Sequence, residues 1–165
     1  MDKNKRYLVA RQQIELEKAM KIPTKPNAMI TQLVGELANA CNNHDLEKAI
    51  QFYAQNYQGT DISETKPRHG HDGVRQWLKR YWEAAPDMHF TCEQIIVQEN
   101  RAAISWKAQG THRGYWMHIP PTGKMFTVKG VSFLTITGEQ IQTGEYIWDV
   151  AEFLRCIRLL PELPE

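Results

Sequence analysis

One aspartate and one histidine stand where a small protein could use them for proton transfer. Asp149 directly follows Trp148, at the junction between an alternating stretch and an apolar run that begins at Val150. A carboxyl group with apolar neighbours holds its proton more tightly, which suits a general acid or base. His112 ends another alternating stretch and shares the face of Trp106. Asp149 and His112 are therefore the candidate catalytic residues.

Each of these residues also has a purely structural interpretation. Aspartate is favoured at helix N-caps, and Glu152, three residues after Asp149, completes the pattern of a capping box. Such a cap contributes on the order of 1 kcal/mol and requires no function. His112 on an apolar face is by default a core histidine whose ring nitrogens are satisfied. The sequence leaves these alternatives open.

A pair of histidines suggests a metal site, but the spacing does not support one. His69 and His71 flank Gly70, and Asp72 follows. No further ligand stands at a recognisable metal-binding spacing. We therefore expect no metal, and instead a loop in which Asp72 caps the next helix. The sequence also contains no glycine-rich phosphate loop and no CxxC pair, so we expect no cofactor.

Composition argues against several classes of protein. The 165 residues suit one domain, and a net charge of +1 gives no indication of binding to nucleic acid or a membrane surface. No apolar run reaches the roughly 18 residues of a membrane span, and no signal-type stretch follows the charged start, so we expect a cytoplasmic protein. The cysteines lack metal or redox spacing and are expected to be buried free thiols: Cys41, Cys92 and Cys156.

The first half of the chain is helical in its periodicity. Residues 1–26 are charged and form no apolar stripe, so we expect an N-terminal extension, followed by one domain over 27–165. Apolar residues then recur at helical spacing over 29–41, over 46–53 with Asp45 as N-cap, and over 74–85. The polar stretch 58–67 is expected to be a loop.

From His89 onward the period of the pattern changes to two. Alternation predicts strands over 89–97, 102–112, 126–136 and 140–148, and a short helix follows from Val150. This order predicts an α+β domain with helices on one face of a curved antiparallel sheet. We expect the enclosed cone to bind a small apolar molecule. Parity with Ile141 places Glu145 and Asp149 toward its interior.

Several segments resemble the SnoaL-like polyketide cyclase (ester cyclase) family. They cover parts of the stretch from Met29 to Leu160, namely residues 70–75, 110–116, 119–124, 128–131 and 148–154. The resemblance implies a nuclear transport factor 2-like fold, a cone of bent sheet and about three helices that is often dimeric. It also implies intramolecular aldol condensation without metal or cofactor. In that reaction an aspartate, matched by Asp149, takes a proton from the carbon between two carbonyls. His112 matches a motif histidine that positions the substrate.

Three functions are consistent with these residues. The first is a cofactor-free cyclase or isomerase for an apolar carbonyl substrate, with Asp149 as acid/base. The second is an epoxide-type hydrolase, for which Glu145 is the sequence-near second carboxylate. The third is a non-catalytic ligand-binding or dimerisation domain in which Asp149 only caps a helix. We expect a homodimer or higher homo-oligomer, and a substrate contacted by Tyr53, Trp82, Trp106, Trp116, Ser132 and Trp148.

Overall fold

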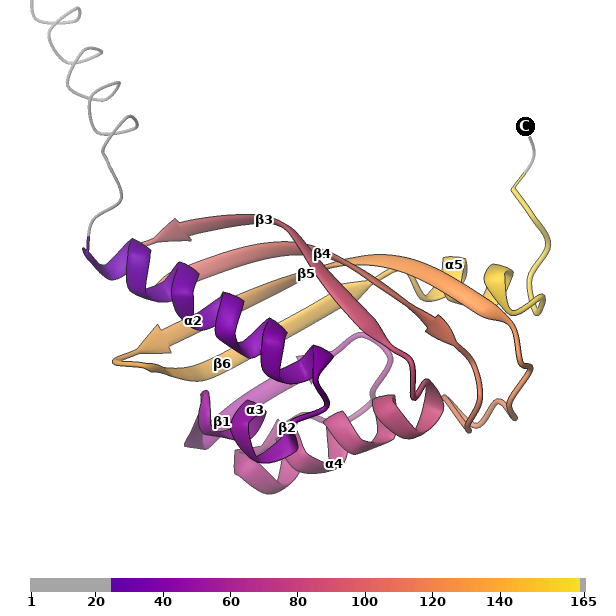
Figure 1. Ribbon diagram of the computed structural model, residues 1–165, viewed down its shortest axis with the longest axis horizontal. Coiled ribbons are helices and arrows are strands. Elements are labelled where there is room, and N and C mark those ends of the chain that lie inside the picture. Colours follow the sequence, from indigo (N-terminus) through magenta and orange to yellow (C-terminus); the bar gives the residue numbers. More distant parts are fainter. Residues whose placement is uncertain (1–24, 164–165) are drawn as a thin grey trace, which may run out of the picture.

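The computed structural model describes residues 25–163. In this part of the chain a six-stranded sheet, in the order β2-β1-β6-β5-β4-β3, carries helices on one side (Figure 1). None of the helices in the same part is long and apolar enough to cross a membrane. The predicted extension, residues 1–26, lies outside the described residues except for its last two positions, which belong to the first helix.

In the described residues, three helices pack beside the sheet and a fourth follows the last strand. They are α2 (Lys25–Asn42), α3 (Leu46–Gln51), α4 (Gly70–Ala84) and α5 (Val150–Cys156). Asp45 caps α3 as predicted, because its side chain accepts a hydrogen bond from the Lys48 N–H. Asp72 does not cap α4: His69 occupies the N-cap position without a side-chain hydrogen bond, and Asp72 lies in the first turn. There its negative charge faces the positive end of the helix dipole.

The predicted meander is confirmed, with bounds that differ by at most one residue. It comprises β3 (His89–Gln98), β4 (Arg101–Thr111), β5 (Met125–Thr137) and β6 (Gln140–Trp148). Successive strands of the meander pair antiparallel. Their alternating buried and exposed residues give the sheet one apolar face toward the helices.

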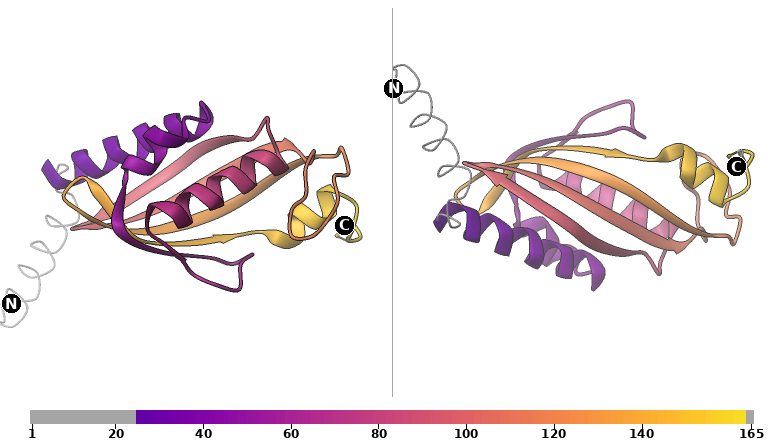
Figure 2. Two further views of the ribbon diagram at one scale, coloured as in Figure 1. Left: turned by 90° about the horizontal axis from the view of Figure 1, so that it is seen from below. Right: turned by 90° about the horizontal axis from the view of Figure 1, so that it is seen from above.

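Two further strands were not predicted, and they make the sheet mixed. β1 (Tyr53–Asp61) pairs parallel with β6, and β2 (Arg68–His69) pairs antiparallel with β1. The prediction of a wholly antiparallel sheet is therefore wrong, as is the helical assignment of Tyr53 and the loop assignment of residues 58–61. The α+β class and the placement of the helices are confirmed, and Figure 2 shows α4 lying along the length of the sheet.

A bulge in β6 reverses the predicted orientation of its second half. Ile141 pairs with Ile136, but Thr143 pairs with Thr135, so one extra residue is inserted between them. Ile141 is buried, and after the bulge the buried residues are Gly144, Tyr146 and Trp148. Glu145 and Asp149 are consequently exposed instead of pointing into the cone.

Candidate functional site

A cavity of about 140 Å³ lies between α2, α4 and the apolar face of the sheet. All five tryptophans of the chain line it: Trp77, Trp82, Trp106, Trp116 and Trp148. The six residues predicted to contact a substrate also all lie on its wall: Tyr53, Trp82, Trp106, Trp116, Ser132 and Trp148. Their location agrees with the prediction, and their binding of a substrate stays a prediction.

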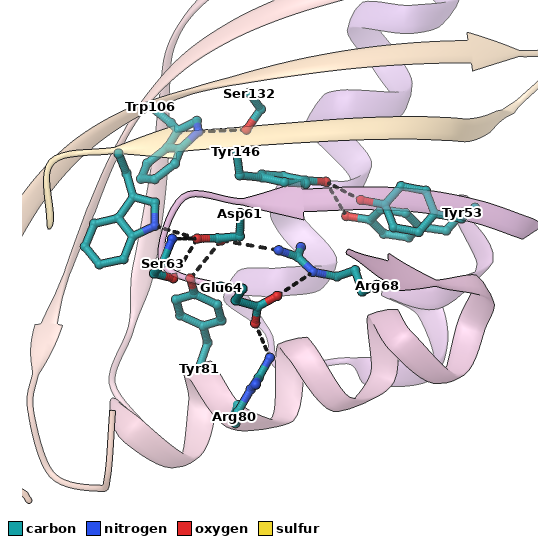
Figure 3. Close-up of polar contacts among 12 residues, drawn as sticks. Tyr53, Asp61, Ser63, Glu64, Arg68, Arg80, Tyr81, Trp106, Ser132 and Tyr146 are labelled. Carbon is teal, nitrogen blue, oxygen red and sulfur yellow. Dashed lines mark hydrogen bonds and ion pairs between the residues drawn. The ribbon is translucent and has the colours of Figure 1, made fainter. Parts of the chain in front are cut away.

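Among residues 25–163, the cavity wall carries a single carboxylate, Asp61 at the end of β1. Its side chain is only 2% exposed. Oδ1 accepts hydrogen bonds from the Trp148 indole N–H at 3.0 Å and from the backbone N–H and hydroxyl of Ser63 at 3.0 and 2.7 Å. Oδ2 accepts one from the Tyr81 hydroxyl at 2.9 Å (Figure 3). Together these donors hold the carboxylate of Asp61 in one orientation.

Arg68 balances the charge of this carboxylate from the next strand. Its Nη2 lies 3.4 Å from Asp61 Oδ2 and its Nε lies 3.3 Å from Glu64 Oε2. The guanidinium group stacks 4.0 Å from the centroid of the Trp77 ring. Glu64 in turn pairs with Arg80 at the surface (Figure 3). Because an unpaired buried charge is strongly destabilising, the ion pair with Arg68 explains how Asp61 is tolerated beside an apolar cavity.

Hydroxyl groups provide most of the remaining polarity of the site. The hydroxyl oxygens of Tyr53 and Tyr57 lie 3.4 and 3.5 Å from that of Tyr146. Burial raises the pKa of all three tyrosines, so their hydroxyls stay protonated. On the neighbouring strands, the Trp106 indole N–H donates to the Ser132 hydroxyl at 2.9 Å. The cavity is thus apolar, with a carboxylate and several neutral hydroxyls on its wall.

Asp149 lies outside this cavity and caps α5. Its side chain is 52% exposed, and Oδ1 accepts a hydrogen bond from the Glu152 N–H at 2.7 Å. The reciprocal half of a capping box is missing, because the Asp149 N–H donates to the Lys129 carbonyl and Glu152 pairs with Arg155. The cap interpretation is confirmed. The catalytic role of Asp149 stays a prediction, now without a contact between its carboxylate and the cavity.

His112 is fully buried, but it is not among the residues that line the cavity. Its Nδ1 lies 3.1 Å from the Thr122 hydroxyl, and its ring packs edge-on against Phe153. Burial lowers the pKa of His112, so the ring stays neutral near neutral pH. His112 and Asp149 therefore do not meet in one pocket, and the substrate-positioning role of His112 stays a prediction.

The segment that carries most of the family resemblance is the loop between β4 and β5. The N–H groups of Arg113 and Gly114 donate to the Ala84 carbonyl at the end of α4, while Gly123 donates to the His112 carbonyl. The loop places the Trp116 ring 5.6 Å from that of Trp148, on the cavity wall. The motif therefore builds a loop that shapes the cavity.

The other candidate residues do not add chemistry to the site. Glu145 is exposed, on the opposite side of the sheet from Tyr146, so it supplies no second carboxylate for the hydrolase alternative. His71 is occupied by a 2.7 Å contact between its Nε2 and the Tyr53 carbonyl. No group of three or more His, Cys, Asp or Glu side chains within residues 25–163 could hold a metal ion.

The cysteines are free, as predicted, but they are not all buried. Cys92 is exposed and the other two are partly buried. Cys41 and Cys92 both line the cavity. Burial raises the pKa of the Cys41 thiol to about 12, so this group stays protonated and is a poor nucleophile at neutral pH.

Sequence reasoning missed Asp61 and the residues that hold it. The stretch around Asp61 is polar, which by itself favours a loop. A signal was present, because Tyr57, Gly59 and Asp61 alternate with polar residues at the strand period of two. The partners Arg68 and Tyr81 come from β2 and α4, and only the tertiary structure brings them together.

Solved structures resemble the chain over most of its length. A SnoaL-like polyketide cyclase from Agrobacterium tumefaciens C58 is 18% identical, with a TM-score of 0.66 over 76% of this chain and 94% of that one. An NTF2-like protein of unknown function from Burkholderia pseudomallei is 21% identical, with a TM-score of 0.66 over 77% and 95%. TerC, co-crystallised with polyporic acid, is 15% identical, with a TM-score of 0.64 over 78% and 97%.

These structural likenesses establish the nuclear transport factor 2-like fold. No curated protein matches the chain in sequence. The family comparison is more specific, since residues 31–157 match the sequence profile of the SnoaL-like polyketide cyclases, which spans well over half of the 165 residues. The chain therefore belongs to the SnoaL-like polyketide cyclase family.

Proposed function

We propose that the protein catalyses proton transfer on a small, apolar, carbonyl-bearing molecule held in the cavity, without a cofactor, and that Asp61 is the acid/base. The observation that carries this proposal is the position of Asp61: it is the carboxylate that residues 25–163 place on the wall of the tryptophan-lined cavity. Family membership and the polyporic acid bound by TerC favour a ring-forming or ring-bearing substrate.

In the proposed reaction, Asp61 Oδ2 takes the proton from a carbon next to a carbonyl group, and the C–H electron pair becomes an enolate. In a cyclase the enolate carbon then attacks a second carbonyl carbon of the same molecule. A carbon–carbon bond forms, and the proton held by Asp61 passes to the new alkoxide. The apolar wall excludes water, which strengthens the electrostatic interactions that guide the transfer.

The first half of this reaction can be tested without the natural substrate. The probe is 2-indanone, a flat ketone whose α-protons exchange with solvent once an enolate forms. Proton NMR in heavy water follows the loss of the α-proton signal. We expect wild-type protein to accelerate the exchange and Asp61→Asn to abolish the acceleration. Asp149→Asn is the matched control, because asparagine is as good an N-cap as aspartate, and it should exchange at the wild-type rate.

A second variant protects the test against misfolding. Asp61→Asn leaves the buried Arg68 with Glu64 as its remaining ion-pair partner, whereas Asp61→Asn combined with Arg68→Met removes both charges of the Asp61–Arg68 pair. Circular dichroism checks that each variant is folded. Loss of exchange in Asp149→Asn with retention in Asp61→Asn would return the acid/base role to Asp149. Binding of 2-indanone without any catalysed exchange would favour the non-catalytic ligand-binding alternative.

The proposal also includes assembly into a homodimer through the sheet. The side of the sheet away from α2, α3 and α4 exposes large apolar residues on three strands, namely Ile96, Phe133 and Ile147. Exposed apolar side chains that gather on one surface mark a site of association.

The epoxide-type hydrolase ranks below the proton-transfer enzyme, because Glu145 lies on this outer side and not beside Asp61.

A further inference from the structure

Three tyrosine hydroxyls meet at one end of the cavity. Tyr57 donates a hydrogen bond to the Tyr146 oxygen at 3.5 Å, and Tyr53 and Tyr146 share another at 3.4 Å in which either oxygen can be the donor. All three side chains are buried. Tyr53 and Tyr146 line the cavity, whereas Tyr57 is not among its lining residues.

Counting hydrogens shows that this cluster keeps one donor unused. Three hydroxyls carry three hydrogens, and the two hydrogen bonds among them use two. The hydrogen of Tyr57 is committed to Tyr146. The unused hydrogen therefore belongs to Tyr146 when Tyr53 donates, or to Tyr53 when Tyr146 donates. In both cases it is on a tyrosine of the cavity wall.

Ser132 holds a second unused hydrogen nearby. Its hydroxyl accepts the Trp106 indole N–H, which is the one hydrogen bond that residues 25–163 give it, so its own hydrogen has no acceptor. The serine is only 5% exposed and lines the cavity. Ser132 and Tyr146 are direct partners in the β5–β6 register, so both side chains stand on the same face of the sheet. An unused buried donor is costly, and a ligand acceptor would relieve that cost.

We propose that Ser132 and the Tyr53–Tyr146 pair are the donors that hold the carbonyl oxygens of the ligand, and that the cavity therefore selects uncharged ketones over hydrocarbons of the same shape. This inference rests on the proposed function, since it supplies the groups that would stabilise the enolate oxygen while Asp61 holds the proton. Preorganised donors of this kind act where negative charge develops in the reaction. The buried, protonated tyrosines suit that role because they can only donate to such an oxygen.

Binding can be measured through the intrinsic fluorescence of the protein, because every tryptophan of the chain lines the cavity. The probes are 2-indanone and indane, which share one ring skeleton and differ by the carbonyl group. We expect the double variant Tyr53→Phe/Tyr146→Phe to bind 2-indanone about 5-fold more weakly, the usual contribution of one hydrogen bond. Its affinity for indane should be unchanged or higher.

Tyr57→Phe is the matched control within the same cluster. An added Cβ at Gly59 or Gly144 would overlap the Tyr57 hydroxyl, which shows how closely the backbone encloses that group. With Tyr57 removed, Tyr53 and Tyr146 still share one bond and still keep one unused hydrogen. The affinity for 2-indanone should therefore stay within about 2-fold of wild type, the lower limit of a hydrogen-bond contribution. Equal losses for Tyr57→Phe and the double variant would overturn the assignment.

The serine needs a different background, because Ser132→Ala alone would free the Trp106 N–H as a substitute donor. Trp106→Phe is therefore compared with Trp106→Phe/Ser132→Ala, so that only the hydroxyl differs. We expect a further loss of about 5-fold for 2-indanone and none for indane. If both probes weaken equally in the tyrosine and serine variants, the inference is wrong. In that case the exchange catalysed by Asp61 would still stand. Conversely, if wild-type protein does not accelerate the exchange but still binds 2-indanone through these hydroxyls, only the proposed function is overturned.

Discussion

Trp148 and Asp149 are adjacent in the chain, but their side chains point in opposite directions. The Trp148 indole reaches inward and donates to Asp61, whereas the exposed Asp149 carboxylate caps α5. The pair therefore links the cavity to the helix that closes the domain. Of the two carboxylates, Asp61 is the one that faces the cavity, which is why we propose it as the acid/base.

His112 should make the stability of the protein depend on pH. Burial holds the pKa of the folded-state histidine below the value of about 6.5 found in unfolded chains. Between those two values the unfolded chain binds the proton and the folded protein does not. The free energy of unfolding therefore falls as the pH drops below about 6.5, by at most about 1.4 kcal/mol per pH unit for one proton.

Urea denaturation at several pH values between 7 and 5 measures this slope. His112→Gln cannot take up the proton, so it should flatten the slope even where it lowers stability at every pH. His118→Gln is the control, because His118 belongs to the same loop but is exposed. An unchanged slope in His112→Gln would show that protonation of other groups controls the stability in this range.

At the scale of elements, the loop between β4 and β5 depends on a glycine that the family motif supplies. The Gly114 N–H donates to Ala84, and a Cβ at position 114 would overlap the Glu83 carbonyl oxygen. Since the obstructing atoms are backbone, they cannot rotate away. We expect Gly114→Ala to destabilise the protein by about 1–3 kcal/mol. Because the loop carries Trp116, binding of 2-indanone in the cavity should weaken as well.

Gly35→Ala is a control with the opposite expected sign. Gly35 lies within α2, and a Cβ there would meet no atom within 4 Å. Alanine in a helix interior is more stable than glycine by roughly 0.5–1 kcal/mol. Urea denaturation followed by circular dichroism compares the two variants. If the Gly114→Ala protein is as stable as wild type, the loop does not fit closely against α4.

The elements could be predicted from sequence wherever the burial pattern is simple. Over most of their length β4 and β5 bury every second residue, and α4 buries Val74, Trp77 and Leu78 at helical spacing, so these patterns are clear. β1 contains no run of apolar residues, and the bulge after Ile141 leaves no mark in the residue types. These two features decide the site, because β1 presents Asp61 and the bulge turns Asp149 outward. Both depend on pairing between distant strands.

At the scale of the whole molecule, the two sides of the sheet have different tasks. One side, with α2 and α4, encloses the cavity and packs the larger part of the core. On the other side a row crosses four strands, because Ile96, Ala103, Phe133 and Glu145 are successive partners in the register. A groove of about 620 Å³ runs over this row. In a dimer with a twofold axis, this row of one copy would pack against the same row of the other copy, and both rows would be covered.

The test of this interface is the mass of the protein in solution. We expect sedimentation velocity to give twice the chain mass of 19.2 kDa for wild-type protein, falling to one chain mass on dilution or in Phe133→Lys. The new lysine stands opposite Glu145 in the register, so it can pair with that residue in the monomer, while it places a charge in the apolar contact. Tyr115→Lys is the control, since Tyr115 is more exposed, at 72%, and lies in the loop between β4 and β5. Dissociation in both variants would point to an interface elsewhere. A wild-type protein that sediments as one chain at every concentration would contradict the proposed dimer. The cavity would then belong to a monomeric protein.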